Sequence, residues 1–501
     1  MRPRPATDSR QHAASVWRSD PWRRSEGERG GISPAAPISR RTAADRPRRP
    51  GIACDPVADG QLAPPCPKRR GPAVPPRRGR RTSRDRSPDA QVSPDSHPDS
   101  HPDSHHPTHD ARRQPHGSSA LSTDRLRSAP RQVDARLVDR DEDLAALCEQ
   151  LRHEPAIGLD TEFVRTRTFY PRLGLVQVSW ADRVVLLDAV RLERWEPWIE
   201  LITASEPVKI LHSPSEDLEV FQHLADVLPD PLFDTQVAAT LAGLGGTMGY
   251  QKLVAEVVGV DLPKGEQRSN WLRRPLTDSQ RLYAALDVVY LLEIAEHVGR
   301  KLVDMGRWSW LEEEMDRQRE QAVQRQRPEL QYERLARPSM KLEELRVLWS
   351  LNLWREHQAR RRDLPRRFVL GDDVLLEIAR KRPRTAARLR SVSSLQAADR
   401  KRYGSALVEA VEEGIASEAD LEPPASVSGR RSSTHRRLVD RARAVLEECG
   451  GRLDLPVDFL LTRREIDRLA DSVRAGQPWR DELGGWRREV LEQPLAAALD
   501  G

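Results

Sequence analysis

The sequence predicts an α/β domain built on a mixed sheet, followed by two small all-α helical domains and preceded by a disordered tail. Three observations favour this arrangement. Short apolar runs typical of strands alternate with helical patterns between about residues 134 and 301. Behind this region, residues 338–416 and 433–499 have purely helical patterns and share a short repeat. Residues 1–130 have no apolar periodicity at all.

The N-terminal tail has an unusual composition. It holds 21 of the 39 prolines and a low-complexity run of His, Pro, Asp and Ser from His97 to His105. The tail contains 25 Lys and Arg but only 14 Asp and Glu, so its net charge is about +11. The rest of the chain therefore carries about −6. Such a segment cannot bury enough apolar surface to offset its chain entropy, which predicts disorder. Two other interpretations are a metal-binding His run and a start of translation later than Met1.

The cysteines and the hydropathy of the sequence indicate in which compartment of the cell the protein is expected. The four cysteines, Cys54, Cys66, Cys148 and Cys449, lie far apart and form no CxxC pair. This spacing excludes a zinc ribbon and gives no disulfide framework. No apolar run approaches the ~18–20 residues that span a bilayer, and the N-terminus lacks the apolar core of a signal peptide. We therefore expect a cytoplasmic protein with no membrane association.

The α/β region contains four predicted strands. Each is short, apolar and rich in β-branched residues, as strands are; they cover residues 156–160, 173–180, 184–187 and 208–211. Helices are predicted over 192–203 and 215–224, and helical patterns dominate from there to about Lys301. Three consecutive strands followed by alternation with helices indicate a mixed sheet with helices on its faces.

The two helical segments contain one internal repeat with the pattern D-L-P-x-x-F-x-L. It begins at Asp363 in the first segment and at Asp454 in the second, and a helix is predicted after each copy, over 372–381 and 463–470. Five identities in eight positions favour two copies of one small domain, with chance similarity as the alternative.

The connecting segments and the basic clusters suggest a division of labour. Residues 301–338 are charged and rich in Gln and Arg, and they are predicted to be a helix tail plus a linker. Residues 415–432 are polar and are predicted to be a second linker. Arginines and lysines gather between residues 355 and 382, around the first copy of the repeat. This pattern predicts contacts to a nucleic-acid backbone, with a solvated basic face as the alternative.

Four carboxylates and a tyrosine form the constellation that carries chemistry. Asp160 and Glu162 are i and i+2 at the end of a strand, so they point to one face, and two adjacent carboxylates repel each other unless a cation neutralises them. Asp217 lies in the first turns of a helix after a strand, and Tyr283 and Asp287 are i and i+4 on a later helix. Singly, each has an ordinary explanation: a solvated acidic pair, a complement to a helix dipole, or a core aromatic.

Taken in order, these motifs resemble those of the DEDD superfamily of 3′→5′ exonucleases, in its Tyr-containing branch, and of ribonuclease D in particular. The agreement extends over residues 160–177, 215–221 and 264–287, except that Asn270 stands where Asp is expected in the family. The resemblance covers about residues 134–301, and the first helical segment resembles the helicase-and-ribonuclease-D C-terminal domain. It implies a ribonuclease H-like exonuclease fold.

The resemblance also implies a mechanism. Asp160, Glu162, Asp217 and Asp287 would hold two divalent metal ions, Mg²⁺ or Mn²⁺, with Asp160 as the natural bridging ligand. Tyr283 would orient the attacking water, because an unperturbed phenol with a pKa of about 10 is a poor base at neutral pH. The implied activity is a 3′→5′ exoribonuclease that releases 5′-mononucleotides. Its partners would be RNA, namely tRNA precursors and other small structured RNAs, with no obligate protein partner.

Two alternatives stay open at this point. A 3′→5′ DNA exonuclease of the same superfamily would carry the same motifs, since the choice of RNA over DNA depends on contacts to the 2′-hydroxyl. A non-catalytic RNA-binding protein is disfavoured because all four carboxylates and Tyr283 are intact.

Side chains near the first motif have two interpretations as well. Phe163, Phe169 and Tyr170 would either stack on terminal bases or pack a loop against the core. Arg165 and Arg167 are expected to meet phosphates.

Overall fold

The computed structural model of the protein describes residues 128–419, 421 and 432–500. The tail, up to residue 127, and its His-rich run lie outside these residues, so the disorder expected there stays a prediction. Among the described helices, none combines the length and the apolar character needed to cross a membrane.

Six strands form one sheet in the order β1-β4-β3-β2-β5-β6. Their bounds are β1 Ala135–Val138, β2 Ala156–Val164, β3 Arg172–Trp180, β4 Arg183–Asp188, β5 Val208–Leu211 and β6 Leu232–Asp234. The pairs β2–β3 and β3–β4 are antiparallel, and the pairs β1–β4, β2–β5 and β5–β6 are parallel. The predicted mixed sheet is thus confirmed. The edge strands β1 and β6 were not predicted, because four and three residues are too few to show a periodicity.

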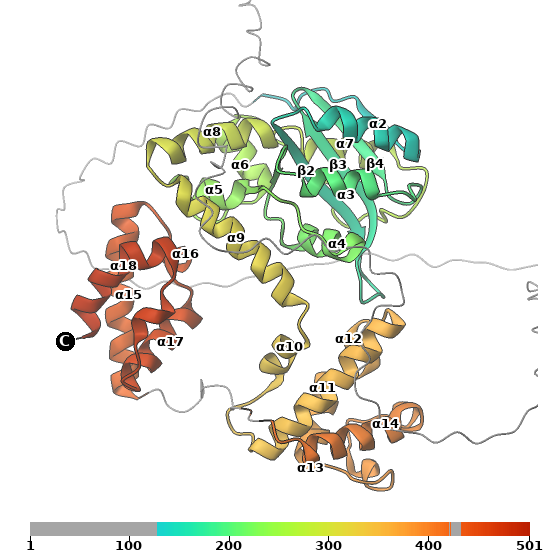
Figure 1. Ribbon diagram of the computed structural model, residues 1–501, viewed down its shortest axis with the longest axis vertical. Helices are drawn as coiled ribbons and strands as arrows, with labels where there is room; N and C mark the ends of the chain where they lie inside the picture. Colours follow the sequence, from blue (N-terminus) through green and yellow to red (C-terminus); the bar gives the residue numbers. More distant parts are fainter. Residues whose placement is uncertain (1–127, 420, 422–431, 501) are drawn as a thin grey trace, which may run out of the picture. The chain divides into compact units, whose positions relative to one another are not determined.

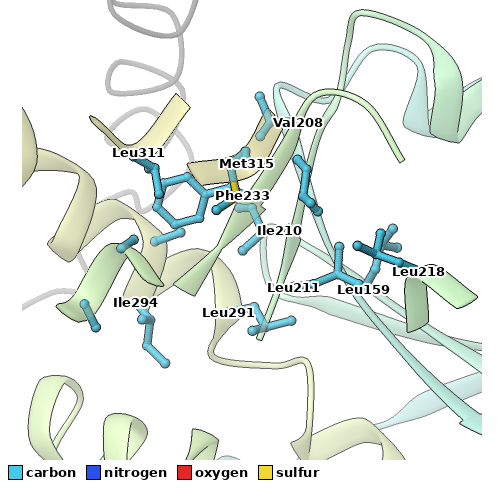
Figure 2. Packing of buried hydrophobic residues seen from close by; sticks show 14 of the residues in the cluster. Leu159, Val208, Ile210, Leu211, Leu218, Phe233, Leu291, Ile294, Leu311 and Met315 are labelled. Atoms are coloured by element: carbon cyan, nitrogen blue, oxygen red, sulfur yellow. The ribbon is translucent and has the colours of Figure 1, made fainter. Parts of the chain in front are cut away.

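Helices pack on both faces of this sheet (Figure 1). They are α2 Asp141–Leu151, α3 Glu196–Thr203, α4 Ser215–Ala225, α5 Thr235–Leu241, α6 Tyr250–Val257, α7 Asp278–Leu286 and α8 Leu291–Asp304. On β2, Leu159 joins the apolar cluster with Leu218 of α4 (Figure 2). The preceding Gly158 faces the other way, where an added Cβ would meet Leu291 of α8. Since side chains alternate along a strand, α4 and α8 lie on opposite faces of the sheet.

The segment predicted as a helix tail plus a linker, residues 301–338, is helical over most of its length. Helices α9 Trp308–Arg325 and α10 Pro328–Leu335 occupy it. Leu311 and Met315 of α9 are buried in the cluster that contains Phe233 of β6 (Figure 2). The linker part of this expectation was wrong, because a narrow apolar stripe is enough to dock a helix whose other faces are charged.

The two helical segments have the same order of elements. The first contains α11 Leu342–Arg362, α12 Arg366–Val369, α13 Asp372–Lys381, the 3₁₀ helix η2 Arg388–Ser391 and α14 Ala397–Ala416. The second contains α15 Ser433–Leu453, α16 Val457–Leu460, α17 Arg463–Arg474, the 3₁₀ helix η3 Trp479–Glu482 and α18 Gly485–Leu499. In each, the long first helix ends at the aspartate of the repeat in a left-handed conformation, with φ of 49° at Asp363 and 55° at Asp454. This correspondence supports two copies of one domain.

The two copies nevertheless pack differently. The first has an apolar core of its own. The second shares the core of the α/β domain: the Trp486 ring stacks on Trp310 of α9 at 4.7 Å, and the Arg487 guanidinium is paired with Glu314. The phenylalanine of the repeat therefore has different surroundings in the two copies. Phe368 is 49% exposed, whereas Phe459 stacks against Trp486.

Candidate active site

Strand β2 and helix α7 bring the sequence motifs together. Asp160 and Glu162 project from the face of β2 that lies under α8. Helix α7 begins with a capping box in which the Thr277 hydroxyl accepts the Gln280 N–H. It carries Tyr283 and ends at Asp287, its C-cap residue. The capping box fixes where the helix starts, and therefore which residues face the sheet.

Three of the four predicted carboxylates form a close cluster. Ligand oxygens of Asp160, Glu162 and Asp287 all lie within 4.8 Å of one another. All three side chains are partly buried. The Tyr283 hydroxyl donates a hydrogen bond to the Asp287 carboxylate, so the tyrosine belongs to the same cluster.

Burial and mutual repulsion make this cluster unfavourable for bare negative charge. Burial, together with the charges of Asp217, Asp287 and Glu162, raises the pKa of Asp160 well above its ordinary value. Burial and the charges of Asp287 and Asp217 raise the pKa of Glu162 to about 9. Burial raises the pKa of Asp287 to about 7, against the opposing hydrogen bond from Tyr283. Groups with strongly shifted pKa values in one place are typical of functional sites.

Asp217 lies beside the cluster without being part of the close group. Its carboxylate accepts a hydrogen bond from the Thr161 hydroxyl. Burial raises the pKa of Asp217 to about 6, and its charge acts on both Asp160 and Glu162. The sequence analysis did not single out Thr161. A small polar residue between two clustered carboxylates, buried at the end of an apolar strand, is the signal that would have found it.

The loop after β2 connects the site to the first helical domain. The backbone N–H groups of Phe169 and Tyr170 donate to the Asp363 carboxylate over 2.9 and 3.0 Å. The Phe169 ring is only 6% exposed and lies in the apolar core of that domain. Packing is therefore the role the structure shows for Phe169. Tyr170 stacks on His223 with ring centroids 4.1 Å apart.

A basic cleft lies next to this loop. Its lining includes five arginines and a single carboxylate, that of Glu219. The arginines come from the loop, α9, α10, α11 and α12, and are Arg165, Arg325, Arg334, Arg360 and Arg366. Arg165 is paired with Glu219 at 2.7 Å. Arg360 and Arg366 share the carboxylate of Glu356, at 2.8 and 2.5 Å.

Comparison with known proteins assigns the chain to a family. Residues 135–303 match the 3′-5′ exonuclease family, and residues 344–411 match the HRDC domain. The chain is 33% identical over 369 residues to a ribonuclease D of Serratia proteamaculans, which covers 73% of this chain and 99% of that relative. The chain belongs to the ribonuclease D family. It is accordingly a 3′→5′ exoribonuclease, as the sequence resemblance implied.

Other ribonuclease D comparisons agree. A ribonuclease D of Xanthomonas oryzae pv. oryzae is 37% identical over 350 residues, which are 69% of this chain and 93% of that protein. The crystal structure of Escherichia coli RNase D superposes with a TM-score of 0.64 and 32% identity, and the match covers 74% of this chain and 99% of that one. The expected ribonuclease H-like exonuclease domain followed by helical segments is thereby confirmed.

The acidic cluster fits the divalent metal ions on which this superfamily depends. Its donors are carboxylate oxygens alone, which suit hard cations such as Mg²⁺ and Mn²⁺. A cation among them would relieve the repulsion that raises their pKa values.

Proposed function

We propose that the enzyme releases 5′-mononucleotides one at a time from the 3′ ends of small structured RNAs, tRNA precursors among them. The ribonuclease D relatives support this substrate class. The solved Escherichia coli relative is described as an exoribonuclease involved in structured RNA processing. The cytoplasmic location expected from the sequence stays a prediction.

The observation that carries the site assignment is the close approach of Asp160, Glu162 and Asp287. We propose that these three carboxylates, together with Asp217, would hold two divalent ions. Such ions supply an activated nucleophile and stabilise charge on the phosphate and on the leaving 3′-oxygen. The carboxylates fix their positions, and partial burial of the cluster keeps bulk water away from them.

Tyr283 acts in this proposal as an orienting group. Burial, with the nearby charges of Asp287 and Glu162, raises the pKa of its hydroxyl, so the phenol stays protonated at neutral pH. A protonated hydroxyl cannot accept the proton of the attacking water as a base would. It can hold that water in position by a hydrogen bond, next to the carboxylates of the cluster.

The basic cleft supports a path for the RNA backbone. It begins at the loop that follows Glu162 and continues along α10 to α11 and α12 of the first helical domain. Arginines contact phosphates without reading sequence, so this surface would hold an RNA body while its 3′ end reaches the carboxylates. Arg367 lies over the exposed Phe368 ring at 5.7 Å and adds a basic and aromatic contact beyond the cleft.

One assay tests the function as a whole. The full chain is incubated with a 3′-extended tRNA, a short single-stranded RNA and a DNA of the same sequence, each with Mg²⁺, with Mn²⁺ and with EDTA. We expect stepwise shortening of both RNAs from the 3′ end, only with a cation, and higher kcat/KM on the tRNA. Faster cleavage of DNA than of RNA would favour the DNA exonuclease instead. Products carrying a 3′-phosphate would contradict the proposed chemistry.

A further inference from the structure

Gln177 is an unexplained polar residue beside the acidic cluster. It lies in the middle of β3, whose other residues from Leu175 to Val178 are apolar. Its side chain is completely buried, and among the described residues neither its amide nitrogen nor its amide oxygen has a hydrogen-bond partner. Leaving a buried amide unpaired costs free energy, so each such group in a folded protein calls for a reason.

The sheet register places this amide next to Asp160. In the antiparallel pair β2–β3, Gln177 is directly opposite Asp160. Residues opposite each other in an antiparallel pair project to the same face, with Cβ atoms about 4.5–5.5 Å apart. Gln177 therefore shares the face of the sheet from which Asp160 and Glu162 project.

A second contact on β3 identifies what covers this face. Ser179, two residues along and on the same side, donates its hydroxyl to the Val288 carbonyl over 2.8 Å. Val288 directly follows Asp287 in the chain. The face of the sheet that carries Gln177 and Asp160 therefore also contacts the segment that follows Asp287.

We propose that Gln177 is a positioning residue: its amide, unpaired in the described structure, needs only a side-chain rotation to donate a hydrogen bond to the Asp160 carboxylate opposite it, and this bond would hold Asp160 ready to bind a divalent cation. This inference rests on the proposed function, in which Asp160 is a cation ligand. Carboxylates that bind metal ions are usually held by hydrogen bonds from neighbouring groups, and loss of such a group typically costs about 10–100-fold in metal affinity or activity. An amide suits this position because it is a donor at every pH and adds no charge to an acidic cluster.

The test compares Gln177→Met with Asn352→Leu, which removes a buried amide from α11 of the first helical domain, in the full chain. Methionine has a similar length and is apolar, so the variant removes the hydrogen-bonding groups and fills the space. Binding of Mn²⁺ is measured by titration calorimetry, and thermal stability is measured in EDTA. For Gln177→Met we expect Mn²⁺ affinity about 10–100-fold weaker, with Tm in EDTA equal to or above that of the wild type. For Asn352→Leu we expect the reverse, a lower Tm and unchanged Mn²⁺ affinity, because it loses a satisfied hydrogen bond to the Pro328 carbonyl and lies outside the nuclease domain.

The outcomes separate this inference from the site assignment. Wild-type Mn²⁺ affinity in folded Gln177→Met overturns the positioning role. Gln177→Leu gives the same comparison if the methionine variant does not fold. Asp160→Asn is titrated alongside: if it binds Mn²⁺ as the wild type does, the proposed ligand set itself is wrong. If Asp160→Asn loses binding while Gln177→Met keeps it, only the role of Gln177 fails.

Discussion

Tyr283 donates its hydroxyl hydrogen bond to Asp287, four residues later on the same helical face, while its ring packs at 6.1 Å from that of Trp271. The ring is therefore held by packing and the hydroxyl by a carboxylate. These two attachments are separable by mutation, because removal of the oxygen leaves the ring contact in place.

Tyr283→Phe should slow turnover by about 10²-fold or more, the usual size of a contribution from a group that moves or orients a proton. KM should change little, since the ring remains. Single-turnover kinetics on a short RNA, with Kd measured separately in EDTA, test this. Wild-type rates would mean that the tyrosine serves only for packing.

Asp160→Asn and Asp287→Asn should each abolish hydrolysis and leave RNA binding intact, because each removes a proposed ligand from a cluster within 4.8 Å. Circular dichroism should show an unchanged fold. Glu320→Asn, on an exposed face of α9, is the control for loss of one carboxylate and should keep full activity. A purified Asp160→Asn protein that degrades RNA at the wild-type rate would refute the proposed mechanism.

The metal-free protein should lose stability as the pH rises. The folded-state pKa values of Glu162 and Asp287 are raised to about 9 and about 7, above their ordinary values of 4.5 and 3.8. The native state therefore keeps protons that the unfolded chain releases, and its stability falls with pH between about 4 and 9. Saturating Mg²⁺ should remove most of this loss, because it binds the ionised carboxylates.

Glu162→Gln provides the check on this linkage. Between pH 5.5 and pH 8.5, the Tm of this variant in EDTA should fall less than that of the wild type, because one of the two proton-binding groups is gone. A change of about 2–4 °C in Tm corresponds to 1 kcal/mol of unfolding free energy in a protein of this kind. Tm is measured by scanning fluorimetry. If the Tm of both proteins falls equally with pH, these carboxylates are not the cause of the loss of stability.

Arg334→Gln should weaken the handling of structured RNA more than that of short strands. Arg334 is exposed and lines the basic cleft. Loss of one phosphate contact should lower the slope of log K against log salt by about 0.7–0.9. Because such a contact binds substrate and transition state alike, KM should rise with kcat unchanged.

The matched control for Arg334→Gln is Arg437→Gln, which removes the same charge from an exposed position on α15 of the second helical domain. kcat/KM is measured on a 3′-extended tRNA and on a short oligonucleotide, at two salt concentrations. Equal effects of the two substitutions would mean that net charge matters and the cleft does not.

Sequence patterns were sufficient where a feature is local or carried by a motif. The four central strands, the helix 372–381 and the residues of the acidic cluster were all predicted. The sequence patterns did not show which charged side chains are buried. Arg355 counts toward a basic cluster in the sequence, yet it is 2% exposed and bonded to Asp372, so it cannot meet a phosphate.

Contacts between side chains from distant segments of the chain could not be predicted from the sequence either. The sequence left Phe169 between stacking on bases and packing, and only the fold brings it to a core formed some 170 residues later. The extent of helix α9 was underestimated for the same reason, because its apolar stripe is buried only through contact with β6. The sequence analysis did not single out Gln177, because its register with Asp160 is known only from the sheet.

The attachment of Phe169 and Asp363 bears on how this protein can be divided. A cut behind α10 would leave an exposed aromatic side chain and two unsatisfied N–H groups on the loop that follows Glu162. A nuclease fragment made in this way would lose activity through damage to its own loop, even on substrates too short to reach the helical domain. Grafting another RNA-binding module in its place should work only if the graft brings its own carboxylate and apolar pocket for this loop.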